Sequence, residues 1–420
     1  EVVFTPAITL WAFLSQVLFK GEQRSCVAAV ARVTVLLVVL ERGPCSGNTG
    51  AYCRARAKLP ETVLRRLTVE VAEGCERQVE ADWLWQGRHV YLVDGSTVSM
   101  PDTPDNQKVY PQSSRQEAGL GFPIARLVVL LSLATGMLKD LALGPYAGKE
   151  RGETALLRHL LDRMEPGAIL LADRYYGSYF MIAWLLERGI DFVTRVHQLR
   201  TVDFRRGRRW GRGDHQVVWR RPVKPDWMDP ATYDRMPASI EVREIQVQVD
   251  HPGFRVESLV VVTTLTDARR YAAADLGALY GSRWQAELDI RAIKISMDLD
   301  VLRCKTPAMV RKEIWTGLLA YNLIRRTLLQ AAQAAGRTPR HLSFSAALQA
   351  IAASWQVLAS NSESLATRLV EIELENLAAH LVGYRPGRVE PRAVKRRPKP
   401  HDLLTKPRDQ ARAELLGAAL

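Results

Sequence analysis

Four polar residues recur at fixed spacing in the stretch YGSRWQAELDIRAIK, residues 280–294. They are Tyr280, Arg283, Glu287 and Lys294. A helix turns about 100° per residue, so these side chains would fall within an arc of roughly 60° along about 21 Å of helix. The stretch therefore predicts one helix with a polar seam, on which a carboxylate lies between two cations.

Apolar residues flank this polar seam on both sides. They are Trp284, Leu288 and Ile295 on one flank and Ile290, Ile293 and Met297 on the other. This pattern predicts a helix that packs on two sides and exposes the seam between them. Arg283 and Glu287 also have the spacing of an ordinary surface ion pair. Other parts of the chain must therefore decide whether the seam does chemistry.

Two aspartates follow apolar runs that are typical of buried strands. Asp94 follows VYLV and precedes Gly95, and Asp173 follows AILLA. A buried carboxylate without a partner is costly, so an aspartate at the end of such a strand indicates a cleft or a bound cation. The alternative is a turn residue, because Asp-Gly is a common turn dipeptide.

Together, Asp94, Asp173 and Glu287 supply three carboxylates from two strands and a later helix. Mg²⁺ or Mn²⁺ takes oxygen ligands and leaves positions for phosphate and water. Two such ions about 4 Å apart would activate a nucleophilic oxygen and stabilise the leaving oxygen in a displacement at phosphorus. In that reading Arg283 and Lys294 hold phosphate oxygens, and Tyr280 donates from its hydroxyl.

The pattern of elements predicts an α/β fold with five regions. Residues 1–85 are predicted to be helical. Residues 86–196 read βββαβαβ, which is the order of a ribonuclease-H-like core with a mixed five-stranded sheet and flanking helices. A basic β-rich insertion at 197–264 interrupts this core, whose second part, 265–335, contains the Glu287 helix. Residues 336–420 form a helical region that ends in a basic, proline-rich tail.

Composition narrows the class of protein and of partner. The 420 residues are 47% hydrophobic and 25% charged, as in soluble globular proteins. The net charge of +13 favours a polyanion, with nucleic acid first and an anionic membrane surface second. Five cysteines without a CxxC pair indicate a reducing cytosol, and the longest apolar run, 27–40, is too short to cross a bilayer. Because the chain begins with Glu1 rather than Met, we expect that an N-terminal segment is missing.

Three motifs in order resemble the DDE transposases of insertion sequence family four. They are DGS at 94–96, ADRYYGSY at 172–179 and the Y-x2-R-x3-E-x6-K spacing at 280–294. NTGAYCRARAKLP at 48–60 and CKTPAMVRKEIWTGLLAYNLIR at 304–325 extend the likeness over nearly the whole chain. The resemblance implies that Asp94, Asp173 and Glu287 are the catalytic, metal-binding residues of a ribonuclease-H-like transposase.

The resemblance also implies a reaction and its partners. A homodimer would act on double-stranded DNA, pairing transposon terminal inverted repeats in the bacterial cytoplasm at the nucleoid. The expected steps are nicking at a transposon end, attack of the freed 3′ hydroxyl to form a hairpin, hairpin opening, and strand transfer into target DNA. The resemblance also implies that the helical residues 1–85 bind DNA. No membrane partner is expected.

A tryptophan in the β insertion of related members stacks on a flipped base near the cleavage site. Trp210 and Trp219 are the candidates here, and spacing does not choose between them. They lie among six arginines, Arg205, Arg206, Arg208, Arg209, Arg212 and Arg220. The alternative for each is a core tryptophan beside a solvated basic face.

Two other functions share these residues. One is a ribonuclease-H-like nuclease or resolvase that hydrolyses DNA without strand transfer, and the other is an inactive DNA-binding relic. Because Asp94, Asp173, Glu287, Arg283 and Lys294 are all present, the sequence favours an active enzyme. The basic run at 395–400 predicts a solvated tail, with contact to the DNA backbone as the alternative.

Overall fold

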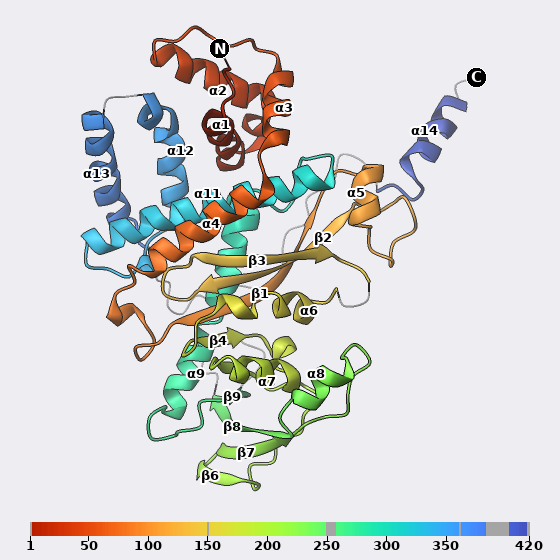
Figure 1. Ribbon diagram of the computed structural model, residues 1–420, viewed down its shortest axis with the longest axis vertical. Helices are drawn as coiled ribbons and strands as arrows, with labels where there is room; N and C mark the ends of the chain where they lie inside the picture. The colour runs from red at the N-terminus through yellow and green to blue at the C-terminus, as the bar shows by residue number, and fades with distance from the viewer. Residues whose placement is uncertain (1, 149–150, 249–257, 361–362, 384–402, 418–420) are drawn as a thin grey trace.

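A nine-stranded mixed sheet runs through the molecule, with helices on both of its faces (Figure 1). The computed structural model describes all residues except 1, 149–150, 249–257, 361–362, 384–402 and 418–420. The strands are β1 (Val90–Ser99), β2 (Ile124–Ser132), β3 (Leu138–Pro145), β4 (Ile169–Ala172), β5 (Asp191–Arg195), β6 (Arg208–Gly211), β7 (Asp214–Arg220), β8 (Ser239–Gln248) and β9 (Ser258–Thr263).

The helices fall into three groups along the chain. Before the sheet come α1 (Pro6–Leu18), α2 (Cys26–Val39), α3 (Thr49–Lys58) and α4 (Glu61–Glu76). Between strands lie α5 (Pro104–Val109), α6 (Glu153–Arg158), α7 (Tyr179–Glu187) and α8 (Pro230–Arg235). After the sheet follow α9 (Ala273–Gly281), α10 (Trp284–Arg291), α11 (Pro307–Ala334), α12 (Phe344–Ser360), α13 (Glu363–Ala379) and α14 (Arg408–Gly417). Short 3-10 turns occur at Gly21–Arg24, Ala81–Trp83, Leu161–Arg163, Arg174–Tyr176 and Pro339–His341.

Five strands form the predicted core in the order β3-β2-β1-β4-β5. β1 pairs antiparallel with β2, and β2 with β3, whereas β4 runs parallel to both β1 and β5. The β2–β3 connection is the predicted hairpin, and its Gly136 has a φ of 74°, which a residue without Cβ adopts at little cost. This strand order and these directions define a ribonuclease-H-like core, as the sequence predicted.

The insertion extends this sheet rather than forming a separate one. β9 pairs antiparallel with β5, from Val193 opposite Thr263 to Arg195 opposite Val261. β8, β7 and β6 then continue the sheet outward, so the five-stranded sheet expected for the core becomes nine-stranded. The physical reason is that β5 would otherwise present an edge of unpaired backbone groups. The sequence prediction also lacked α5 and α8.

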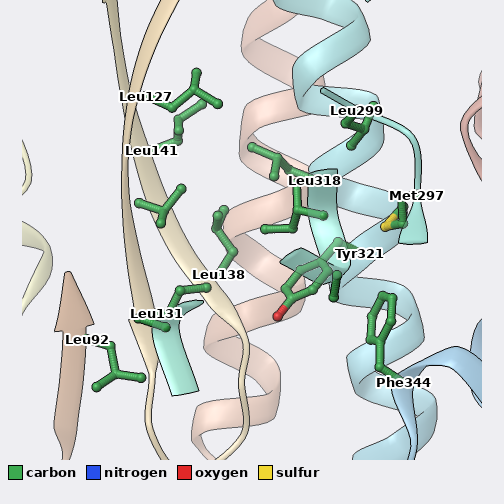
Figure 2. Packing of buried hydrophobic residues seen from close by; sticks show 14 of the residues in the cluster. Leu92, Leu127, Leu131, Leu138, Leu141, Met297, Leu299, Leu318, Tyr321 and Phe344 are labelled. Carbon is green, nitrogen blue, oxygen red and sulfur yellow. The ribbon is translucent and has the colours of Figure 1, made fainter. Parts of the chain in front are cut away.

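One face of the sheet packs against α11, which is 28 residues long and is the central helix of the molecule (Figure 1). Figure 2 shows Leu131 and Leu138 of the sheet facing Leu318 and Tyr321 of α11. Leu92 of β1 belongs to the same cluster, so Asp94, two residues further along the strand, lies on this face as well. α6 and α7 cover the opposite face.

The segment 280–294 is not the single regular helix predicted. α9 ends at Gly281, α10 begins at Trp284, and Ala292–Ser296 is a π-helical turn. Hydrogen bonds from residue i to i−3 tighten the chain at the first junction, and the π turn widens it at the second. The polar residues of the seam therefore come from three consecutive segments with different pitch.

Only one flank of the seam is packed as predicted. Ile293 and Met297 are buried, and Ile290 packs against the core. On the other flank, Trp284 and Ile295 are 54% and 59% exposed. The sheet and α11 cover one side of this segment, so the second apolar flank, which includes Leu288, faces solvent.

Two sequence predictions concern membranes and the tail. The apolar run at 27–40 forms most of α2, and no helix among the described residues is long and apolar enough to cross a membrane. The basic run at 395–400 lies outside the described residues.

Candidate active site

Asp94 and Asp173 lie at the point where the pairing of two neighbouring parallel strands, β1 and β4, ends. The last paired residues are Val93 of β1 and Ala172 of β4, so each aspartate is the next residue of its chain. Asp94 lies within β1 rather than at its end, because β1 continues to Ser99 while paired with β2 alone. Both carboxylates are thus placed beside the open edge that β1 exposes beyond the end of β4.

Each aspartate is oriented by the backbone that follows it. Oδ1 of Asp94 accepts a hydrogen bond of 2.8 Å from the N–H of Gly95. Oδ1 of Asp173 accepts one of 2.6 Å from the N–H of Arg174, where Asp173 caps the turn Arg174–Tyr176. In each case the other carboxylate oxygen is left for another partner.

Glu287 reaches the same neighbourhood from α10. Its Oε1 accepts a 2.7 Å hydrogen bond from Nη2 of Arg283, one turn earlier. Burial lowers the pKa of Arg283, but Glu287, Tyr280 and Asp173 raise it to a net value above the ordinary one. Arg283 also lowers the pKa of Asp94. The guanidinium is therefore the electrostatic neighbour that all three predicted carboxylates share.

The negative charges at this site are incompletely balanced. Burial raises the pKa of Asp94 to about 6, against the opposing effects of the Gly95 N–H and of Arg283. The carboxylates of Glu153 and Glu287 also contribute to this raised value. A carboxylate held in this way binds a proton or another cation more readily than an exposed one does.

Tyr280 belongs to this group, and Lys294 is paired elsewhere. Burial raises the pKa of the half-buried Tyr280, Arg283 lowers it and Asp173 raises it, so its hydroxyl lies within electrostatic range of both. Nζ of Lys294 instead contacts Oδ1 of Asp300 at 2.7 Å, within the segment that follows the π turn. Electrostatic contacts thus connect five of the six residues predicted to line the site, and Lys294 is the exception.

The chemistry of these donors fits a hard divalent cation, which takes carboxylate oxygens. Within the described part of the chain, however, no three Asp, Glu, His or Cys side chains lie close enough together to hold a metal ion as they stand. The Arg283–Glu287 ion pair gives a physical reason, since it turns the Glu287 carboxylate toward a cation of the protein itself.

The two tryptophans of the insertion differ in exposure. Trp219 is 4% exposed, its Nε1 donates to Glu244 at 3.0 Å, and the Arg200 guanidinium lies 3.6 Å from the ring centroid. It is a core residue, the alternative considered above, and it is not available to a flipped base. Trp210 lies on the outermost strand β6, partly exposed, with Arg208 4.0 Å from its ring centroid.

Sequence reasoning missed two residues beside the aspartates, Glu153 and Tyr176. Glu153 is the first residue of α6, and Tyr176 ends the turn that Asp173 caps. An acidic residue in the first turn of a helix is ordinarily explained by the helix dipole, so its position in the sequence gave no signal of a role at the site. The YY pair after Asp173 was part of a quoted motif, but nothing in it distinguished the buried Tyr176 from the exposed Tyr175.

The strand order and the two strand-borne aspartates define a ribonuclease-H-like protein with an acidic site. Residues 85–323 match the family described as Transposase DDE domain, which is more than half of the chain. The chain belongs to this family, and the predicted membership among DDE transposases is confirmed. The matched segment contains Asp94, Asp173 and Glu287.

Two curated relatives are transposases of Escherichia coli (strain K12). The transposase InsG for insertion sequence element IS4 is 27% identical over 299 residues, which cover 70% of this chain and 64% of that protein. The putative transposase InsZ is 27% identical over 147 residues, or 34% of this chain and 46% of that protein. The chain thus matches less than two thirds of the length of either relative. A solved piggyBac transposase synaptic complex with hairpin DNA aligns with a TM-score of 0.45 and 10% identity, covering 92% of this chain and 78% of that one.

Proposed function

We propose that this protein is a cut-and-paste DNA transposase that hydrolyses phosphodiester bonds at insertion-sequence ends and transfers the freed strand into target DNA. The observation that supports it most is the meeting of Asp94 and Asp173 on adjacent strands, with Glu287 linked to both through Arg283. Three carboxylates and one cation around an open strand edge suit a phosphoryl group, whose reaction needs positioning and charge stabilisation.

Mg²⁺ or Mn²⁺, as two ions, is the cofactor that we infer for Asp94, Asp173 and Glu287. When bound, such ions activate the attacking oxygen and stabilise the leaving oxygen at phosphorus. Asp94 and Asp173 each have one carboxylate oxygen oriented by the backbone and one remaining for a cation. Glu287 joins them once Arg283 exchanges its carboxylate partner for a DNA phosphate.

The seam residues have distinct tasks in this proposal. Arg283 holds a phosphate oxygen beside the three carboxylates, and Tyr280 donates a hydrogen bond from its hydroxyl. Lys294 contacts a phosphate further along the backbone, which requires it to leave Asp300. The exchange of a protein carboxylate for a phosphate would couple DNA binding to the assembly of the site.

Double-stranded DNA is the proposed substrate, as terminal inverted repeats and as target. The net charge of +13 supports a polyanionic partner. All six arginines predicted to flank the insertion tryptophans are exposed, namely Arg205, Arg206, Arg208, Arg209, Arg212 and Arg220. They lie at the outer end of the sheet, on β6 and β7, in the turn that joins these strands and in the segment before β6. Pairing of two ends would require two copies of the chain, so we propose a homodimer in the synaptic complex, in the bacterial cytoplasm at the nucleoid.

The test incubates the protein with a labelled duplex of its own flanking end sequence and Mg²⁺, and resolves the products on a denaturing gel. A transposase uses a 3′ hydroxyl as nucleophile, so hairpinned or target-joined DNA is expected. Hydrolysed strands alone, at protein concentrations that saturate the ends, would instead establish the nuclease or resolvase. Binding without any cleavage would establish the inactive relic.

Alanine variants of the three carboxylates assign the site in the same assay. Asp94→Ala, Asp173→Ala and Glu287→Ala should each abolish cleavage and retain DNA binding, because each removes a metal ligand and not a docking surface. Glu187→Ala is a matched control, since Glu187 is an exposed carboxylate at the end of α7. A carboxylate variant that still nicks DNA would remove that residue from the site.

A further inference from the structure

A fourth carboxylate lies against the backbone beside Asp94. A Cβ atom built at Gly95 would come within 2.2–2.5 Å of the carboxylate carbon and both oxygens of Glu153. While Glu153 stays in this position no side chain fits at residue 95, so the lack of a Cβ there lets Glu153 rest on β1. Because side chains alternate along a strand, Glu153 supports β1 from the face opposite to Asp94.

The same carboxylate is linked to the segment that carries Asp173. Oε2 of Glu153 accepts a 3.0 Å hydrogen bond from the hydroxyl of Tyr176. Tyr176 is 1% exposed and ends the turn that Asp173 caps, so its ring is held firmly in the core. Burial, and then the charges of Glu153 and Asp94, raise the pKa of Tyr176, so the phenol keeps the proton that it donates.

The pairing of β1 with β4 does not by itself fix the positions of the two aspartates. β1 and β4 are hydrogen-bonded only as far as Val93 and Ala172, one residue before each aspartate. Beyond that point the ladder no longer fixes the two chains relative to each other. Glu153 joins them one residue after Asp94 and three residues after Asp173.

We propose that Glu153 is a positioning residue of the active site. Its carboxylate rests on Gly95, accepts from Tyr176, and so fixes the separation of Asp94 and Asp173. This inference rests on the proposed function, in which those two aspartates act together on one phosphoryl group. A displacement of about 1 Å in such a site costs roughly a hundredfold in rate, so the loss of the link should slow the reaction.

The experiment compares Glu153→Ala, Glu153→Gln, Tyr176→Phe and the double variant Glu153→Ala/Tyr176→Phe. The rate is measured in a single turnover on a pre-bound, labelled transposon end with Mg²⁺, and DNA affinity is measured separately in EDTA. Tyr179→Phe is the matched control, because it removes the hydroxyl of another buried tyrosine, whose 2.6 Å hydrogen bond goes to the carbonyl oxygen of Pro237.

A positioning role has a defined signature. Glu153→Ala and Tyr176→Phe should each slow cleavage about 10- to 100-fold with DNA affinity within about twofold of wild type. The double variant should be no slower than the slower single variant, because both changes break one link. Glu153→Gln should recover most of the rate, since its amide oxygen still accepts from Tyr176. Tyr179→Phe should cleave at the wild-type rate.

Three results would overturn the inference. One is wild-type cleavage by Glu153→Ala, and another is a double variant whose loss is the product of the two single losses. The third is a Glu153→Gln variant as slow as Glu153→Ala, since that would place the charge itself at the reacting atoms. Asp94→Ala and Asp173→Ala run beside these variants, and cleavage by either would defeat the proposed function instead of this inference.

Discussion

Arg283 spans one helical turn to Glu287, with Nη2 of the guanidinium 2.7 Å from Oε1 of the carboxylate. The same guanidinium lowers the pKa of Asp94, and Asp173 in turn raises the pKa of Arg283. One protein cation therefore lies among the three carboxylates proposed to form the site. The residue proposed to hold a phosphate also neutralises Glu287 until the phosphate arrives.

Replacing Arg283 with Ala should slow the chemical step far more than it weakens DNA binding. One phosphate contact among many changes affinity little, whereas a misplaced phosphate costs about a hundredfold in rate. The cleavage rate of Arg283→Lys should lie between those of wild type and Arg283→Ala, because lysine keeps the positive charge but lacks the planar guanidinium with its two parallel donors. Single-turnover cleavage and equilibrium binding on the same labelled end measure both quantities. A variant that loses only affinity would make Arg283 an ordinary docking residue.

Residue spacing predicted part of the geometry of the polar seam at 280–294. Spacing alone placed Tyr280, Arg283 and Glu287 on one side of a helix, and the structure brings these three together. Spacing could not predict the π turn that follows, because its wider pitch depends on how Ile293 and Met297 pack into the core. The pairing of Lys294 with Asp300 was therefore not predicted.

The strands of the sheet could be predicted from local sequence patterns, whereas the pairing of distant strands could not. Alternating and apolar runs predicted the five core strands and the hairpin at Gly136, because those patterns depend on neighbours in sequence. The junction of β5 with β9 joins Val193 to Thr263 across the whole insertion, and no local pattern specifies it. The support of Gly95 by Glu153 is long-range for the same reason.

The raised pKa of Asp94 predicts a pH-dependent difference between wild type and Asp94→Asn. The pKa is about 6 in the folded protein and 3.8 ordinarily, so the stability contributed by this group is fully present below 3.8 and is lost as the pH rises through 6. Asn keeps the acceptor for the Gly95 N–H without the charge. Above pH 6, Asp94→Asn should therefore be more stable than wild type by about 3 kcal/mol, and near pH 4 the two should converge.

Urea unfolding between pH 4 and pH 8, in EDTA and without DNA, measures this difference directly. The free energies of unfolding of the two proteins should separate as the pH rises from 4 to 6 and then run parallel. A separation that does not vary with pH would mean that the Asp94 carboxylate is not held in an environment that opposes its charge.

Asp289 anchors the helix of Glu287 and should be important for stability. Its carboxylate is fully buried, two residues after Glu287, and pairs with Arg325 and with Arg340 at 2.7 Å. Arg340 also donates to the carbonyl oxygen of Ser132 at the end of β2, so the pair ties α10 to the sheet. Asp289→Ala leaves the buried Arg325 and the largely buried Arg340 without their carboxylate, and it should lower the free energy of unfolding by about 3–5 kcal/mol.

A surface pair on the next segment supplies the control for Asp289. Asp300 is about half exposed and pairs with Lys294, so Asp300→Ala should change the free energy of unfolding by at most about 1 kcal/mol. Urea denaturation of both variants gives the comparison. Equal losses would show that the buried cluster does not hold α10 more firmly than a surface ion pair does.

The exposed arginines of the insertion predict a change in the salt dependence of DNA binding. Each phosphate contact that is removed should reduce the slope of log K against log salt by about 0.9. Arg209→Gln and Arg212→Gln should each lower the slope by this amount on any duplex, because phosphate contacts do not read sequence. Arg337→Gln, at an exposed residue just after α11, should leave it unchanged. Unaltered slopes for both insertion variants would place the DNA on another surface.

Trp210 is the insertion tryptophan that can still meet a base, because Trp219 is enclosed by Glu244 and Arg200. Stacking is worth about 1–3 kcal/mol per base, so Trp210→Ala should slow cleavage of a fully paired end about tenfold or more. An end with a mismatch beside the cleavage site has already lost its pairing, and on that substrate the loss should be smaller. Trp219→Phe instead removes the buried hydrogen bond to Glu244. Any loss of cleavage rate that it causes should be the same for the fully paired end and the mismatched end. If Trp210→Ala instead slowed cleavage of the fully paired end and of the mismatched end by the same factor, Trp210 would support the strand β6 and would not stack on a flipped base.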